Sequence, residues 1–193
     1  PELGAALVEL VRDDDPQVRM QLACTLGAWP DARAGAALGQ LALRDAGDRY
    51  LTAAVLSSVS RKNLDRVLLT VMKGGAKEPP PGALVESLLR LASALGDTRA
   101  LAALLTAVGT PERGKYARWQ FAALAGLLDA LGERNTLLTK LQAEGGDELK
   151  AALKRLSGLF DAARAALADR RAAQADKLLA VRLLGRGLDH QEE

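Results

Sequence analysis

The chain has 193 residues, of which 49% are apolar and only 3% aromatic, and its formal net charge is +2. Ala and Leu dominate the apolar residues and Ile is absent. Because strands draw on β-branched and aromatic residues whereas Ala and Leu favour helices, this composition excludes an all-β fold and argues against a parallel α/β sheet. So small a charge excess gives no reason to expect nucleic acid or an anionic membrane as partner. No apolar run reaches the ~20 residues of a membrane span.

The first part of the chain, residues 1–73, predicts two pairs of helices that repeat at an interval of 33 residues. Asp15 precedes a proline, which is a typical helix start, because Asp accepts hydrogen bonds from the first-turn amides and proline loses none at the first helical position. Asp48 begins the second pair 33 residues later. Asp31 and Asn63 start the second helix of each pair.

The rest of the chain predicts two further pairs over residues 83–145, after a loop rich in Pro and Gly over residues 74–82. The second helix of the fourth pair is placed at Leu137, Leu138 and Leu141. The pattern then changes over residues 146–193, which predict a longer, divergent pair.

In this divergent pair, Asp147 is expected to cap a long helix that reaches about Ala168. A final helix contains Leu178 and Leu184. Residues 188–193 are interpreted as the entry to a unit that has been cut away, which would leave the last unit with an exposed apolar face.

Two helices in every 33 to 36 residues are typical of an α-solenoid, because a two-helix unit cannot bury both of its apolar faces alone. We therefore expect an all-α fold: a right-handed α–α superhelix of the HEAT/armadillo type, with about 10 or 11 helices in stacked antiparallel pairs. Residues 1–193 are expected to form a single solenoid domain, excised from a longer protein.

Several segments resemble the HEAT-like helical region of large planctomycete-type proteins that are similar to membrane-bound dehydrogenases. These segments are Asp15–Ala23, Leu26–Trp29, Leu41–Asp45, Trp119–Leu127 and Arg182–Arg186. In that family a sugar-dehydrogenase-like β-propeller precedes the helical region, and a haem-binding C-x-x-C-H segment follows it. The resemblance implies an architectural segment between redox modules, in an exported, extracytoplasmic parent protein.

No haem attachment carries over from this resemblance, because Cys24 is followed by Thr25 and Leu26 rather than by the C-x-x-C-H pattern. Cys24 falls on the apolar side of its helix and is expected to be a buried, inert thiol. A nucleophilic thiol needs a basic partner, and the only His, His190, lies in the C-terminal tail. No cofactor, metal or catalytic residue is therefore expected.

Carboxylates gather in two of the predicted interhelical turns and allow two interpretations. They would either bind a cation together or cap helix N-termini, and helix capping is preferred because the spacing of a calcium loop is absent. The residues concerned are Asp13, Asp14, Asp15, Asp45 and Asp48.

One cluster combines basic and aromatic residues and is the candidate interaction patch: Arg113, Lys115, Tyr116, Arg118 and Trp119. Such a cluster would stack bases and hold phosphates in a nucleic-acid-binding protein. In the preferred interpretation, Trp119 instead begins a core stripe with Phe121 and Leu124, and the arginines lie along the surface beside it.

The function expected from these patterns is that of a non-enzymatic scaffold or protein-interaction segment, whose partner is a protein or a neighbouring domain of the same chain. A small-molecule ligand is not expected. The alternative is a nucleic-acid-binding helical repeat with a basic concave face. Against this alternative, the second helices average about two basic residues per unit, fewer than 6–10 phosphate contacts would require. A catalytic helical domain is disfavoured, because no nucleophile–base pair is present.

Overall fold

The computed structural model describes residues 2–74 and 80–187, and helices dominate both ranges. In these ranges no β-strand forms, although an isolated bridge pairs Glu112 with Lys115. The chain divides into two compact units, with the boundary between Leu84 and Val85. None of the described helices is both long and apolar enough to cross a membrane. The predictions of an all-helical fold and of helices packed in pairs are confirmed.

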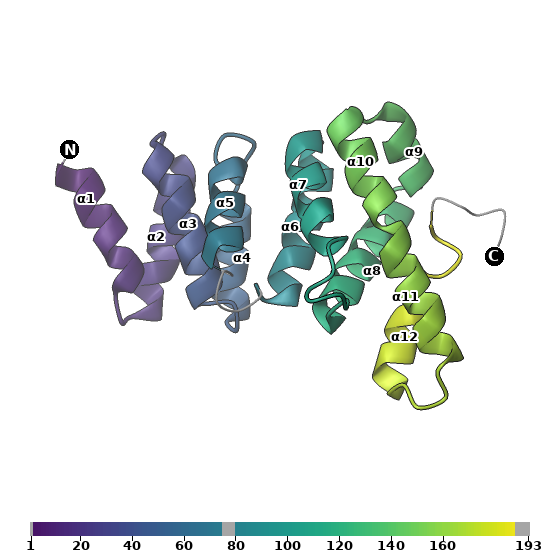
Figure 1. Ribbon diagram of the computed structural model, residues 1–193. Coiled ribbons are helices and arrows are strands. Elements are labelled where there is room, and N and C mark those ends of the chain that lie inside the picture. The colour runs from purple at the N-terminus through teal and green to yellow at the C-terminus, as the bar shows by residue number, and fades with distance from the viewer. Residues whose placement is uncertain (1, 75–79, 188–193) are drawn as a thin grey trace. The chain divides into compact units, whose positions relative to one another are not determined.

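The N-terminal unit places two helix pairs side by side (Figure 1). The first helices of the pairs, α2 and α4, pack on each other, and so do the second helices, α3 and α5. The predicted caps at Asp15, Asp31 and Asp48 are confirmed, since each carboxylate accepts a 2.8 Å hydrogen bond from a first-turn amide. The elements of this unit are α1 (Glu2–Glu9), the 3₁₀ helix η1 (Leu10–Arg12), α2 (Pro16–Ala28), α3 (Ala32–Arg44), α4 (Arg49–Ser58) and α5 (Leu64–Gly74).

A buried ion pair joins the start of α2 to the end of α3. Arg19 Nε and Nη2 donate to the two carboxylate oxygens of Asp45 at 3.0 and 2.7 Å, and both residues are less than a tenth exposed. Arg19 Nη1 also donates to the backbone carbonyls of Asp13 and Asp14, at 2.8 and 3.0 Å. The hydrogen bonds from Arg19 to Asp45 raise the pKa of the guanidinium group. The buried charge is thus fully paired, as burial requires.

Two glycines allow α3 and α5 to approach closely. Gly35 and Gly39 are four residues apart and lie on the same face of α3. A methyl group at Gly39 would lie 2.7 Å from Cβ of Thr70, and one at Gly35 would lie 2.6 Å from Cβ of Arg66. These separations are far below a normal carbon–carbon contact, so the packing of α3 on α5 requires glycine at both positions.

The C-terminal unit packs α7 against α10, and α12 against both α8 and α11. The short helix α9 contributes only Leu138 to the buried residues and packs on α10. The helix that covers α7 is therefore α10 rather than the segment around Leu137–Leu141. The helices are α6 (Gly82–Leu95), which begins before the unit boundary, α7 (Thr98–Val108), α8 (Arg118–Glu133), α9 (Leu138–Glu144), α10 (Asp147–Arg155), α11 (Ser157–Ala168) and α12 (Gln174–Leu183).

The long helix expected from Asp147 to Ala168 is interrupted at Leu156. Gly146, not Asp147, is the N-cap of α10, and no side chain caps that end. Leu156 is buried and keeps nearly helical torsion angles, φ −67° and ψ −17°, so the interruption is slight. It allows α10 to pack on α7 while α11 packs on α12. This division and the short helix α1 add to the helices that the sequence pattern placed.

The prediction that Cys24 is buried is wrong, because its side chain is exposed. The buried face of α2 contains Leu22, Ala23 and Leu26. Cys24 lies two residues after Leu22, about 200° around the helix axis, and so points away from this face. His190, residues 188–193 and residues 75–79 of the predicted loop lie outside the described residues.

Replacing Asp45 by Ala should lower the free energy of unfolding of the N-terminal unit by about 3–5 kcal/mol, because it leaves the Arg19 charge buried without a carboxylate. Asp14→Ala is the matched control. Asp14 is fully exposed and lies 4.0 Å from Arg44, so its loss should change stability by less than about 1 kcal/mol. Urea unfolding monitored by circular dichroism measures both, and equal losses would show that the buried pair has no special role.

Replacing Gly39 by Ala should destabilise the chain by about 1–2 kcal/mol, because the added methyl forces α3 away from α5 and this outweighs the gain in helix propensity. Gly132→Ala in α8 is the control, since a methyl there meets only the flexible Arg186 side chain, at 3.4 Å. It should raise the melting temperature, whereas Gly39→Ala lowers it. An unchanged or higher melting temperature for Gly39→Ala contradicts the close approach of the two helices.

Candidate functional site

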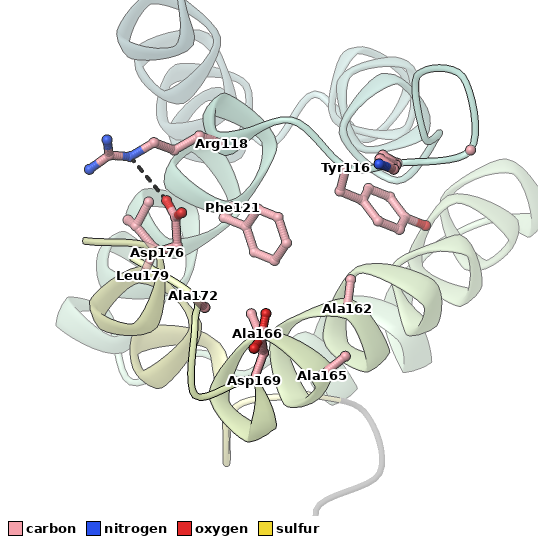
Figure 2. A pocket seen from close by; sticks show the side chains of 12 residues that line it. Tyr116, Arg118, Phe121, Ala162, Ala165, Ala166, Asp169, Ala172, Asp176 and Leu179 are labelled. Atoms are coloured by element: carbon pink, nitrogen blue, oxygen red, sulfur yellow. Dashed lines mark ion pairs between the residues drawn. The ribbon is translucent and has the colours of Figure 1, made fainter. Parts of the chain in front are cut away.

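An open pocket of about 750 Å³ lies between α8, α11 and α12 in the C-terminal unit. Figure 2 shows the Phe121 side chain of α8 directed toward the space between these helices. Opposite it, three alanines of α11 form a flat wall, because positions 162, 165 and 166 lie on one helix face. Ala172 and Leu179 extend this apolar surface along the third side.

Tyr116 is held against the pocket by a ring contact and by a hydrogen bond. Its ring meets Phe121 edge to face, with centroids 6.3 Å apart and an interplanar angle of 78°. Its hydroxyl donates to the Gly109 carbonyl at 3.2 Å. Burial, and secondarily the charge of Asp161, raise the pKa of Tyr116, so that the phenol stays protonated and keeps donating. This side of the pocket is therefore formed before any ligand arrives.

The basic residues Arg113 and Lys115 belong to a tight turn that precedes α8. Glu112 and Lys115 exchange both backbone hydrogen bonds, at 2.8 and 3.0 Å. Between them, Arg113 and Gly114 have positive φ angles of 50° and 80°, as in a type I′ turn. The turn places Arg113 at its tip and Lys115 in the pocket lining.

The buried side chain of Gln120 fixes this loop to the start of α8. Its Oε1 accepts from the Ala117 amide at 2.8 Å, and its Nε2 donates to the carbonyls of Val108 and Thr110, both at 2.8 Å. The side chain thus connects both ends of the loop to one helical residue. Gln120 was not predicted as part of the site; its only local signal is its position three residues after the N-cap Ala117, which is typical of a capping box.

Charged groups lie at separate places around the apolar wall. Arg118 Nε is 3.6 Å from Asp176 Oδ1, an ion pair between α8 and α12 (Figure 2). Asp169 follows the end of α11, and its carboxylate accepts from the Arg171 amide at 2.8 Å. Neither Lys115 nor Arg113 forms a side-chain ion pair within residues 2–74 and 80–187.

The structure brings together part of the candidate interaction patch. Lys115, Tyr116 and Arg118 line the pocket, whereas Arg113 and Trp119 do not. Trp119 is half-buried, and its Nε1 donates to Glu112 Oε1 at 3.2 Å. The apolar residues of α11 and α12 that complete the pocket were not linked to the patch by any sequence pattern.

Most of the carboxylates that were candidates for a cation site form hydrogen bonds within the N-terminal unit instead. Asp15 and Asp48 cap helices, Asp45 binds Arg19, and Asp13 accepts from the Asp15 amide at 2.8 Å. Within the described ranges, no group of three or more His, Cys, Asp or Glu side chains is placed to hold a metal ion.

The pocket helix α12 is attached to α8 by two arginines that share one carboxylate. Arg182 Nη2 and Arg186 Nη1 lie 2.5 and 2.6 Å from the two oxygens of Asp129. Burial alone would raise the pKa of Asp129, but the hydrogen bonds from Arg186 and Arg182 outweigh it, so the net pKa is lowered. A lowered folded-state pKa stabilises the fold above the unfolded-state pKa, and this contribution is lost as pH falls through the folded-state value.

Replacing Asp129 by Asn should therefore destabilise the C-terminal unit at pH 7 more than at a pH below the lowered pKa of Asp129, where the wild-type carboxylate is protonated and has lost its charge. The difference in the free energy of unfolding between the two proteins, measured by urea titration at both pH values, should shrink on acidification. A difference that stays constant over this range would show that ionised Asp129 does not stabilise the packing of α12.

No protein-family model, curated protein or solved structure matches this chain. The pocket itself offers an apolar wall, a fixed aromatic pair and charged residues in its lining.

Proposed function

We propose that this chain is a non-catalytic helical-repeat segment, a HEAT- or armadillo-like α-solenoid, that binds a protein or a neighbouring domain of a larger protein. The observation that carries the proposal is the packing order in the N-terminal unit, where α2 lies on α4 and α3 on α5. Asp15 and Asp48, 33 residues apart, cap equivalent helices, and Leu22 and Val55 are buried at the same interval. Repetition of one packing unit is how a solenoid extends its surface.

The distribution of charge favours a protein partner over a nucleic acid. Many arginines face a carboxylate of the same unit, as in Arg19–Asp45, Arg33–Asp31 and Arg118–Asp176. A duplex-binding surface needs basic side chains that exchange their counterions for phosphates, and an arginine already paired with a carboxylate contributes little to this exchange.

Exposed apolar side chains on α12 also favour a protein partner. Leu178 and Val181 are 61% and 58% exposed, and they lie three residues apart on one side of the helix. Apolar area that stays in contact with water favours association with another protein surface, which would remove it from water.

We further propose that the segment belongs to a larger dehydrogenase-like, haem-binding protein, on the strength of the resemblance of Asp15–Ala23 and of the other similar segments. The open reading frame of the parent gene tests this proposal. It should encode a β-propeller upstream and a C-x-x-C-H segment downstream, and a parent lacking both would contradict it.

A direct binding comparison tests the protein-interaction proposal. The purified chain is used to select from a random peptide library displayed on phage, and it is titrated against a fluorescently labelled DNA duplex at low salt. We expect selected peptides with micromolar affinity and no duplex binding at micromolar protein. Duplex binding that weakens steeply with salt would instead support the nucleic-acid alternative. Failure to select any peptide would contradict the proposed function.

A further inference from the structure

We propose that the pocket between α8, α11 and α12 receives an amphipathic helical segment of a partner protein, bound in one orientation. Its apolar side chains would lie against Phe121 and the alanine wall of α11. An acidic residue at one end would face Lys115, and a basic residue at the other end would face Asp169. This inference rests on the proposed function, because it specifies the surface and the chemistry of the protein contact.

The apolar wall suits a helix better than it suits an extended chain. Ala162, Ala165 and Ala166 extend no further than a methyl group, so the backbone of a partner helix can approach α11 closely. Phe121 and Leu179 remain only half-buried in this structure and offer apolar area to the side chains of that helix. The pocket volume of about 750 Å³ is enough for several side chains at once.

The charged residues around the alanine wall favour one orientation of the bound partner segment. Lys115 and Arg113 are exposed, and both precede the N-terminus of α8, whose dipole is positive. Asp169 follows the C-terminus of α11, whose dipole is negative. The Arg118–Asp176 pair is neutral as a whole and adds no net charge. A partner segment with acidic and basic ends in the opposite order complements Lys115 and Asp169, and the reversed segment places a like charge beside each of them.

The site is also rigid, which limits the entropy lost on binding. Gln120 and Tyr116 hold the loop before α8 through hydrogen bonds to backbone groups. The shared carboxylate of Asp129 holds α12 in place. A partner thus meets a preformed surface, and most of its binding free energy is not consumed in ordering this chain.

Peptides selected from the library are compared for binding to wild type and to four variants, with the full chain throughout. Ala165→Trp fills the pocket from an exposed position, and Ala151→Trp on the exposed face of α10 is its control. Lys115→Glu reverses the charge at one end of the pocket. Lys150→Glu, on α10 and outside the pocket lining, is the control for that change. Circular dichroism checks that each variant folds.

The proposal predicts that the selected peptides carry apolar residues at helical spacing, with acidic residues enriched at one end and basic residues at the other. Their affinity, measured by fluorescence anisotropy, should fall about tenfold or more for Ala165→Trp and Lys115→Glu and stay unchanged for the controls. A synthetic peptide with its charged ends exchanged should bind about tenfold more weakly. Asp169→Lys, which reverses the other end, provides a second charge variant should Lys115→Glu fail to fold.

Four results would overturn the inference. Selected peptides that bind Ala165→Trp as well as wild type would place the contact elsewhere and leave the proposed function intact. Some peptides would bind wild type but not Ala165→Trp and yet carry no charged ends, or keep their affinity for Lys115→Glu. Such peptides would show that the pocket binds a segment of different chemistry. Self-association in sedimentation experiments that Ala165→Trp abolishes would identify a second copy of this chain as the occupant. If no peptide is selected at all, both the inference and the proposed function are wrong.

Discussion

Each helix pair of the N-terminal unit has apolar residues that the pair itself does not cover and that the neighbouring pair buries. In the N-terminal unit, this need is met by α2 on α4 and by α3 on α5. The small residues Gly35 and Gly39 bring the backbones of α3 and α5 together, while the buried Arg19–Asp45 pair ties α2 to α3. The glycines act between consecutive pairs, and the ion pair acts within one pair. Together they determine how the helices of the N-terminal unit pack.

Local signals in the sequence were enough to place most of the helices. Asp15, Asp31 and Asp48 are caps because a carboxylate binds the amides of the next turn, and this depends on only a few consecutive residues. The buried stripes follow from helical periodicity in the same way. The packing in pairs follows from the repeat interval, since an amphipathic pair that recurs has to meet its own copy.

Features that depend on distant residues were not predictable. Arg19 lies 26 residues from Asp45, and no local pattern distinguishes it from an exposed arginine. Cys24 was misplaced because a helical stripe with many small residues leaves the direction of the buried face uncertain by a residue or more. The interruption at Leu156 likewise depends on which partners α10 and α11 meet, and the residues around it continue a helical pattern.

The same limit applies to the candidate site. Its basic and aromatic half, Lys115, Tyr116 and Arg118, is contiguous in sequence and was found. Its apolar half comes from α11 and α12, which the fold brings to α8 from about 50 residues further along the chain. Alanines on a helix give no indication of what faces them. Gln120, which fixes the loop, was missed because a buried glutamine and an exposed one look alike in a sequence.

One helix, α12, connects two features that the sequence keeps apart. It supplies Asp176 and Leu179 to the pocket, and Arg182 on the same helix binds the carboxylate of Asp129. Asp129 itself belongs to α8 and is not among the residues that line the pocket. One wall of the pocket thus depends for its position on an ion pair formed outside the pocket.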